Sequence, residues 1–543
     1  MSLAAAQSKD DFLPAPLRAV APYFVLALVV FAAYGNIFDN VFLFDDDLLI
    51  LSNSYLHGWG HLGDLLKGST TSGVHIEGGF YRPVQMLLYL LVFHLGDGST
   101  FWFHLLNLSL HVANTCFVYR LGIKLGFRPW GVFLAALVWG LHPLHTEAVT
   151  YMSGTADPLF AFFCLWAVIS VLPDVTLCKI LKIIPLFLLG LGSKETAIVL
   201  PLLLMTCMFL TNQRRLDFHT YWPTWPLWCI SILYTVWRLH AEGFVGPQHT
   251  AEFNALHNYD NLALYADSPI YRVYTFLATL PAYLKLLALP GGLHMERAFL
   301  LYTTAWSVSV MAGLGLVVLA VMQIIHSSKK PNLGIEMSWG VLWFASAHVP
   351  DSGILIPVNA IYLEHWMYLP SVGLFLGVGE TAAKLLQSRS RSSVFACSAI
   401  VLSFAGVLSV KTYNQNVIWH DPVSFYGNIF KYGERSERAH NNLALYYMHE
   451  GDYDDALEQF NQALAISDTY ARTRYNIAVT YLHMPDQSAH IPEAIQSLNR
   501  AIELDPKFYR SYQLLGDIYD SLGDKDKTKY YNDYAETLLK QSQ

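Results

Sequence analysis

Three consecutive carboxylates, Asp45, Asp46 and Asp47, follow directly after the first apolar run of the chain. Charge at the mouth of a hydrophobic span is costly and is usually kept for a function. A carboxylate can remove the proton from a hydroxyl nucleophile, so Asp45 and Asp46 are candidates for a general base. The alternative is that the triplet is only a solvated exit from the span.

Cationic side chains that could hold an anion occur far along the chain from this triplet. Arg82 lies in the motif YRPVQ, and Arg272 lies near the start of a later apolar stretch. In the motif GSKETAI, Ser193 is expected to cap a span and Glu195 to be stabilised by its helix dipole. Lys194 at the same helix start is unfavourable unless an anion lies beside it. Such cations can hold the phosphate of a leaving group.

The outer end of another span carries the motif LHPLHTEAVTYMSGTADP. Its polar side chains include His142, His145 and Glu147. Two histidines three residues apart can bind a metal ion, but Pro143 interrupts the helix between them and no third ligand follows at a set spacing. We therefore assign no metal to this motif. Asp157, directly before a proline, is typical of a helix N-cap.

Glu364 and His365 lie just before a later span, in the motif LEHWMYLPS, where a first-turn carboxylate is favoured by the helix dipole. Together with the residues above, they predict one outward-facing cleft that contains both carboxylates and cations. Such a cleft could deprotonate an acceptor hydroxyl while it holds a lipid-linked phosphate. A lipid-carried donor suits an extracytoplasmic enzyme, because nucleotide sugars are not supplied on that side.

The composition indicates a polytopic membrane protein with some soluble mass. Hydrophobic residues make up 54% of the chain and charged residues 14%, against about 25% charged residues in soluble domains. The net charge of −8 gives no reason to expect a nucleic acid as a partner. The six cysteines lie inside or at the ends of apolar runs without a CxxC motif, so we interpret them as packing residues. The first apolar run lacks a small-residue cleavage site and is interpreted as an uncleaved signal anchor.

The apolar runs predict an all-α membrane domain over residues 1–411, with about eleven spans. Basic clusters in short loops, taken as cytoplasmic, place residues 36–100 in the first extracytoplasmic loop. Two more apolar stretches, 82–96 and 270–290, are expected to be helices in the outer interface, and the count becomes about thirteen if both cross. The expected spans are 17–35, 101–121, 130–143, 157–173, 180–192, 195–211, 222–240, 301–325, 336–349, 366–385 and 392–411.

After the last span the composition becomes soluble, with an expected linker over 412–436 and three tetratricopeptide (TPR) units over 437–543. Small and large residues recur at the spacing of paired helices, and three units are about the minimum for a stable stack. An ordinary helical hairpin bundle is the alternative. The odd number of spans puts the units on the extracytoplasmic side. The repeat positions are Leu443, Ala444, Tyr447, Gly451, Tyr453, Ala456, Phe460, Ala463, Ile477, Ala478, Tyr481, Ala494, Leu498, Ala501, Pro506, Leu515, Gly516, Tyr519, Gly523 and Ala535.

The order of these motifs resembles that of the transmembrane-and-TPR O-mannosyltransferases (the TMTC family) and their bacterial relatives, within the GT-C glycosyltransferase superfamily. The resemblance implies inverting transfer of a single hexose such as mannose from a polyprenyl-phosphate carrier to Ser or Thr of exported proteins. It also implies that one of Asp45 and Asp46 is the general base and the other its support. The matching stretches are FDDDLLILSN, YRPVQMLLYLLV, FHLLNLSLHV, LHPLHTEAV, GTADPLFAF, GSKETAI, PDSGILIP, LEHWMYLPSVG and NVIWHDP.

The resemblance further implies that Arg82 and Lys194 meet the donor phosphate. Two positions depart from the family pattern: Thr155 stands where relatives usually have arginine, and His365 replaces an arginine after Glu364. Two contacts to the phosphate or the sugar are therefore missing or changed. The residues expected to bind donor or substrate are Arg82, His142, His145, Glu147, Lys194, Glu195, Arg272, Glu364 and His365.

Two other functions also fit the sequence. The chain could be a non-enzymatic membrane scaffold whose TPR units dock partners, or a GT-C enzyme that glycosylates a glycan or a lipid. The expected partners are the polyprenyl-phosphate-linked sugar, a protein acceptor presented by the TPR units, and the bilayer. No cofactor is required, and a bound divalent cation is the alternative left open. We expect the bacterial inner membrane, or the endoplasmic reticulum in a eukaryote, with the catalytic loops and TPR units outside the cytoplasm.

Overall fold

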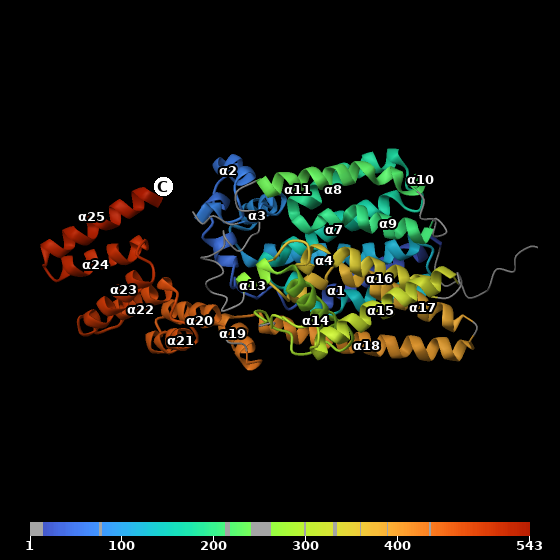
Figure 1. Ribbon diagram of the computed structural model, residues 1–543. Helices are drawn as coiled ribbons and strands as arrows, with labels where there is room; N and C mark the ends of the chain where they lie inside the picture. The colour runs from blue at the N-terminus through green and yellow to red at the C-terminus, as the bar shows by residue number, and fades with distance from the viewer. Residues whose placement is uncertain are drawn as a thin grey trace, which may run out of the picture. The chain divides into compact units, whose positions relative to one another are not determined.

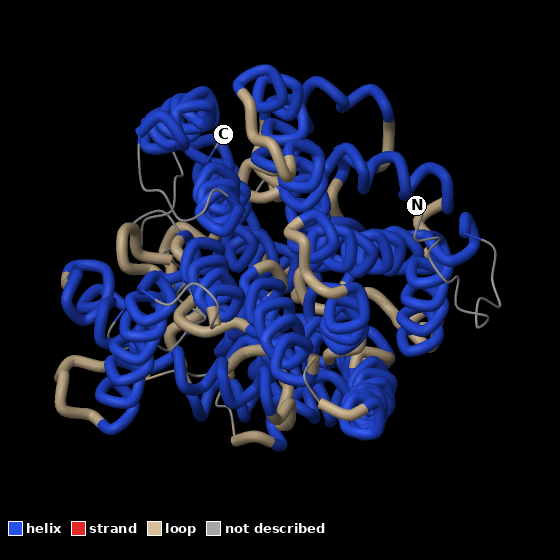
Figure 2. The backbone as a smooth tube through the Cα atoms, turned by 90° about the vertical axis from the view of Figure 1, so that its right-hand side faces the viewer, coloured by secondary structure: helices blue, strands red, loops and turns tan. Residues whose placement is uncertain are grey.

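The computed structural model describes the following residues: 15–74, 79–211, 218–240, 262–297, 300–329, 334–358, 360–387, 389–433 and 436–542. Every regular element within these ranges is a helix, as Figure 2 also shows, so the all-α prediction is confirmed there. The chain divides into two compact units. The first contains the helices from α1 to α11 and from α14 to α18; the second contains α13 (Leu262–Asp267), residues 294–297 and the described chain from Asp421 onward.

The first unit is a bundle of apolar helices joined by loops and short 3-10 turns. In Figure 1 its long helices run in roughly the same direction, and α2 (Leu62–Lys67) and α3 lie at one end of them. The main helices are α1 (Ala15–Tyr34), α3 (Pro83–Gly96), α4 (Thr100–Lys124), α5 (Pro129–Gly140), α7 (Ala156–Val171), α8 (Leu177–Ser193), α9 (Leu200–Thr211), α11 (Trp225–His240), α14 (Pro269–Ala288), α15 (Val308–Lys329), α16 (Ile335–His348), α17 (Pro370–Leu386) and α18 (Arg391–Ile418).

Each apolar run forms helix, but two boundaries differ clearly from the prediction. Helix α15 begins seven residues late, at Val308, and α18 continues through the first residues of the expected linker to Ile418. The extension is stabilised because its polar residues are satisfied within the unit. The Thr412 hydroxyl donates to the Leu141 carbonyl at 2.8 Å, and the Asn416 amide donates to Asn36 at 3.0 Å.

By length and composition, three of the described helical stretches can cross a membrane alone, namely Met152–Val171, Val308–Lys329 and Arg391–Ile418. A fourth candidate is the pair Pro129–Gly140 and Pro143–Val149, bent by 49°. Three further apolar stretches, Ala19–Tyr34, Pro83–Gly96 and Glu195–Thr211, are shorter, and the count of about eleven spans stays a prediction. Close helix packing supports the bundle: a Cβ at Gly340 of α16 would lie 2.4 Å from the Gly373 carbonyl oxygen of α17.

A buried polar stripe on α4 positions the loops of this unit. His104, Asn107, His111 and Asn114 recur at three- and four-residue spacing, so they share one helix face, and all four are fully buried. Their side chains bond to backbone carbonyls at 2.8–3.2 Å. The carbonyl partners are Asn40, Tyr151, Gly140 and Pro158. Because unpaired polar groups are costly in an apolar interior, this stripe holds the loops in a defined place.

The second unit continues from α19 (Pro422–Lys431) into three helical hairpins. They are α20 (Glu437–Glu450) with α21 (Tyr453–Ile466), α22 (Ala471–His483) with α23 (Ile491–Leu504), and α24 (Tyr509–Ser521) with α25 (Lys525–Ser542). The small residues of the repeat pattern, such as Ala444, Ala478 and Ala494, are fully buried between the helices. Gly451 ends α20 in the left-handed conformation with φ 85°, which glycine adopts without strain.

Candidate active site

The acidic triplet follows α1 and leads into a short π-helical turn, Asp47–Leu51, and its three carboxylates differ in exposure. Asp46 is fully buried, Asp45 is half-buried and Asp47 is exposed. Phe44, directly before them, has a positive φ of 58°, which is strained for a bulky residue and must be held by its surroundings. Only Asp45 and Asp47 therefore have carboxylates that a substrate can reach.

Asp46 is fixed by three hydrogen bonds. Its Oδ1 accepts from the Ser153 backbone N–H at 2.8 Å and from the Ser153 hydroxyl at 2.5 Å, and its Oδ2 accepts from the Leu43 N–H at 2.9 Å. Burial raises the pKa of Asp46 to about 7, against the opposing effect of these bonds. The neighbouring Asp45 N–H donates to the Tyr151 hydroxyl at 3.0 Å. Asp46 thus positions the loop on which Asp45 is presented.

The stretch from Tyr151 to Asp157, here called the 151–157 segment, links the triplet to α3. The Met152 carbonyl accepts from the Tyr89 hydroxyl at 2.9 Å, and the Ser153 carbonyl accepts from the Gln85 amide at 3.4 Å. Gln85 and Tyr89 lie one and two turns after Arg82. A Cβ at Gly154 would lie 2.7 Å from the Glu147 carbonyl oxygen, so only glycine fits this close approach.

Arg82 precedes α3 and forms a two-pronged ion pair with Glu195. Its Nε lies 3.1 Å from Glu195 Oε2 and its Nη2 lies 2.7 Å from Oε1. The guanidinium also lies 4.6 Å from the centre of the Phe80 ring. These contacts leave Nη1 of Arg82 without a hydrogen-bond partner among the described residues. Residue 192, near the end of α8, is a glycine. A Cβ added there would lie 2.7 Å from Val84 Cγ2, so the missing side chain lets the end of α8 approach α3.

Lys194 is paired with Asp157 inside the protein. The Nζ–Oδ1 distance is 2.7 Å, and the two side chains are only 6% and 7% exposed. Asp157 therefore supplies the anion that the sequence required beside Lys194. The N-cap interpretation of Asp157 is wrong, because it lies inside the first turn of α7. Ser193 does not cap the next helix either: it ends α8, and its hydroxyl donates to the Leu189 carbonyl.

His365 joins Glu147 to the same network. Its Nδ1 donates to Glu147 Oε1 at 2.9 Å, its backbone N–H donates to Oε2 at 3.1 Å, and its Nε2 lies 3.9 Å from Asp157 Oδ2. Burial alone would lower the pKa of His365, but the Glu147 and Asp157 carboxylates outweigh it and raise the pKa. The two carboxylates thus favour the protonated, positively charged form of His365.

We expect the charge of His365 to make stability depend on pH. Because its pKa is raised in the folded state, its contribution is fully present below its ordinary value of 6.5 and is lost as the pH rises through the raised value. The apparent melting temperature of the wild type in detergent should therefore fall relative to His365→Arg as the pH rises above 6.5. Parallel melting curves for the two proteins across that range would contradict this role.

Asp351 is a member of this network that the sequence did not single out as a site residue. It lies in the 3-10 turn Pro350–Ser352, and burial raises its pKa to about 7 while Lys194 opposes the shift and Asp157 adds to it. Tyr151 and Ser153 were also missed. The motifs PDSGILIP and TYMSGTADP contain these residues and could have pointed to them, but polar residues in loops are too common to be assigned without the fold.

The four remaining expected site residues are all buried. His142 is buried with both ring nitrogens engaged: Nδ1 accepts from the Leu144 N–H at 3.2 Å and Nε2 donates to the Leu287 carbonyl at 3.1 Å. It is therefore not available to a donor or a metal. The other three are buried as well: His145 among aromatic rings, Arg272 within α14, and Glu364 at the start of the turn that carries His365. In the part of the chain that the structure describes, no three His, Cys, Asp or Glu side chains form a metal-binding group.

The network is nearly charge-balanced, and its parts differ in access. The Arg82–Glu195 pair is the more open of the two Arg and Lys pairs, with side chains 16% and 23% exposed, whereas Lys194 and Asp157 are enclosed. Of these two pairs, the one with Arg82 is therefore the more accessible to an incoming anion. The acidic triplet and the network are both bonded to the 151–157 segment, which binds Asp46 through Ser153 and Lys194 through Asp157.

Comparisons with known proteins agree with the motifs. Two profiles described as tetratricopeptide repeat match residues 437–470 and 509–529. The chain is 25% identical to the protein O-mannosyl-transferase F38B6.6 of Caenorhabditis elegans, over 79% of this chain and 60% of that protein. It is 25% identical to the human protein O-mannosyl-transferases TMTC3 and TMTC1, over 84% of this chain and 52% and 57% of those proteins. No solved structure matches.

The fold and these matches define a helical protein with long apolar segments and a C-terminal tetratricopeptide repeat. Over most of its length the chain is homologous to the TMTC protein O-mannosyl-transferases, which confirms the resemblance drawn from its motifs. The chain spans about half to three fifths of the length of these relatives.

Proposed function

We propose that the protein is a membrane glycosyltransferase of the GT-C type that transfers mannose from a polyprenyl-phosphate carrier to Ser or Thr hydroxyls of exported proteins. The names of its relatives support the sugar and the protein acceptor. One observation carries the proposal: the 151–157 segment holds the acidic pair through Ser153 and also pairs with Lys194 through Asp157. The acidic pair that supplies a base for the acceptor and a cation for the donor are thereby held by the same segment.

In the proposed reaction, Asp45 is the general base. The acceptor hydroxyl oxygen bonds to the anomeric carbon as the bond from that carbon to the phosphate oxygen breaks, and the hydroxyl proton passes to the Asp45 carboxylate. Attack from the face opposite the leaving phosphate inverts the anomeric carbon. Asp46 is assigned the supporting role because it is fully buried and already accepts three hydrogen bonds.

The leaving phosphate is assigned to Arg82. Its hydrogen bonds to Glu195 through Nε and Nη2 orient the guanidinium. Nη1 donates no hydrogen bond to any of the described residues. A guanidinium held in this way can bind a phosphate oxygen with little loss of conformational entropy. Lys194 lies deeper and adds positive charge at longer range, while Asp157 keeps it in place.

We further propose that the acceptor protein is presented by the TPR unit and that both sites face the extracytoplasmic side. The bacterial inner membrane is the expected location, or the endoplasmic reticulum in a eukaryotic host. A bound divalent cation is not needed for the assigned roles, since the base and the phosphate contact are both side chains of this chain.

The test is transfer by the purified full chain in liposomes that contain polyprenyl-phosphate-linked mannose, with a Ser/Thr peptide outside. Mass spectrometry should show one added hexose on the peptide hydroxyl, and NMR should show an anomeric configuration opposite to that of the donor. Exported proteins of a host with and without the chain should differ by the same modification. Sugar found only on lipid or glycan, or no transfer at all, would exclude this function in favour of the other enzyme or the scaffold.

A further inference from the structure

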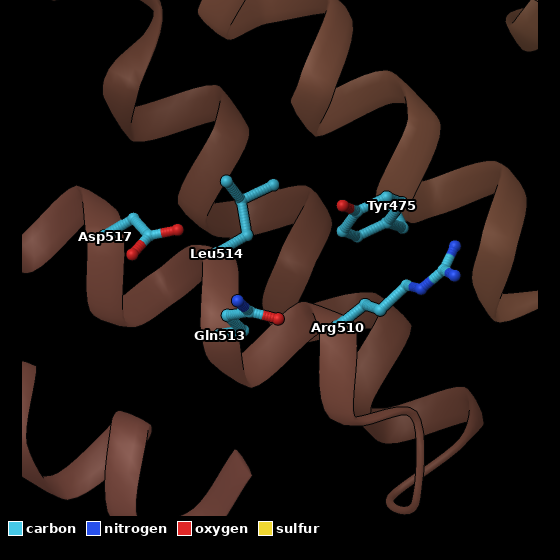
Figure 3. A pocket seen from close by; sticks show the side chains of 5 residues that line it. All are labelled: Tyr475, Arg510, Gln513, Leu514 and Asp517. Atoms are coloured by element: carbon cyan, nitrogen blue, oxygen red, sulfur yellow. The ribbon is translucent and has the colours of Figure 1, made fainter. Parts of the chain in front are cut away.

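A groove of about 230 Å³ lies on the second unit, between the first helices of the second and third repeats. Figure 3 shows its lining: Tyr475 faces it from α22, and Arg510, Gln513, Leu514 and Asp517 come from α24. Arg510 and Asp517 lie at opposite ends, with Gln513 and Leu514 between them. The groove therefore offers a cation, an amide, an apolar surface and an anion in a row.

The spacing along α24 sets the distance between the two charges. Arg510, Gln513 and Asp517 are three and four residues apart and so share one face, which places the two charged positions about 10 Å apart along the axis. Both charged side chains are exposed, and neither has an ion-pair or hydrogen-bond partner elsewhere in the described residues. Two opposite charges on one face that pair with no other described residue are available to a ligand.

The first repeat shows how its arginine binds a carboxylate. Arg438, Arg472 and Arg510 each occupy the second position of the first helix of their repeat. Arg438 forms an ion pair with Glu296, whose carboxylate also accepts from the Ser436 hydroxyl at 3.0 Å. The carboxylate comes from a loop segment, residues 294–297, that packs with this unit. The equivalent arginine in the third repeat, Arg510, is still open.

We propose that this groove binds an extended peptide segment that carries a carboxylate and a cationic side chain three residues apart. The carboxylate pairs with Arg510 and the cation with Asp517, because a segment in the extended polyproline II conformation has three residues per turn and advances about 3.1 Å per residue. Its side chains three positions apart therefore share one face and lie about 9 Å apart. The Gln513 amide can donate to and accept from the peptide backbone between them. The inference rests on the proposed function only in identifying this peptide as part of the acceptor protein.

The test measures binding of labelled peptides to the full chain in detergent micelles by fluorescence anisotropy. Twelve-residue peptides whose other side chains are uncharged would carry Glu and Lys three positions apart in either order, two Glu, or two Lys. One mixed-charge order should bind about tenfold more tightly than the like-charge peptides, because two exposed ion pairs together contribute on that scale.

Charge reversal makes the test specific. The double variant Arg510→Asp with Asp517→Arg should prefer the opposite order of Glu and Lys. The control Lys529→Asp with Asp533→Lys, which exchanges exposed charges on α25 outside the groove, should keep the wild-type preference. Equal affinity for all peptides, or the same preference in the reversed variant, would overturn the proposal.

Binding and transfer can fail separately. Asp45→Asn should bind the preferred peptide as the wild type does, even though it cannot transfer sugar. If the peptide binds as expected but the wild type does not transfer mannose, peptide binding by the groove is established and the proposed function is wrong.

Discussion

Asp45→Asn is expected to lower the rate of mannose transfer by roughly 10²–10⁴-fold, the usual contribution of a general base. The amide has nearly the same shape but cannot take the proton of the acceptor hydroxyl. The backbone N–H of Asp45, which donates to the Tyr151 hydroxyl at 3.0 Å, is kept in this variant. Initial rates in the liposome assay measure the effect, and donor binding should change little.

Asp47→Asn is the matched control for this variant. It makes the same chemical change two residues away, at an exposed carboxylate that accepts a hydrogen bond from the Ser52 hydroxyl. We expect a rate within about twofold of the wild type, since surface substitutions away from special features have small effects. Equal losses in both variants would mean that the triplet acts through its total charge, and the assignment of Asp45 as the base would be withdrawn.

Lys194→Met should destabilise the protein by about 3–5 kcal/mol, the typical result of leaving one partner of a buried ion pair uncompensated. Asp157 would then be a buried carboxylate without its main counterion, 2.7 Å from where the ammonium had been. The apparent melting temperature in detergent should therefore fall by several degrees relative to the wild type.

The double variant Lys194→Met with Asp157→Leu separates this cause from simple loss of packing. Replacing both buried charges by apolar side chains of similar volume is often neutral or stabilising, so most of the stability should return. The double variant should still transfer poorly, because the positive charge near the donor is gone. If it is as unstable as Lys194→Met alone, lost packing and not an unpaired carboxylate explains the single variant.

The sequence determined the elements of this fold because the signals for them are local. Apolar runs long enough for a span became helices, and the small residues of the repeat, such as Ala444 and Ala494, became buried contacts between paired helices. The acidic triplet and the cations were also recognisable, since charge beside an apolar run is costly wherever the chain then folds.

Only the tertiary structure decided how those charges are used. Glu195 lies 113 residues from Arg82 in the chain, and Glu147 lies 218 residues from His365, so no local spacing could predict these pairs. Local spacing was also misleading for Asp157: the sequence predicted a helix cap, and in the structure this residue is the counterion of Lys194. Among three adjacent aspartates, burial under the 151–157 segment made Asp46 a support and left Asp45 accessible. Ion pairing and burial depend on what packs against a side chain, and that is set by the fold and not by the neighbouring residues in the sequence.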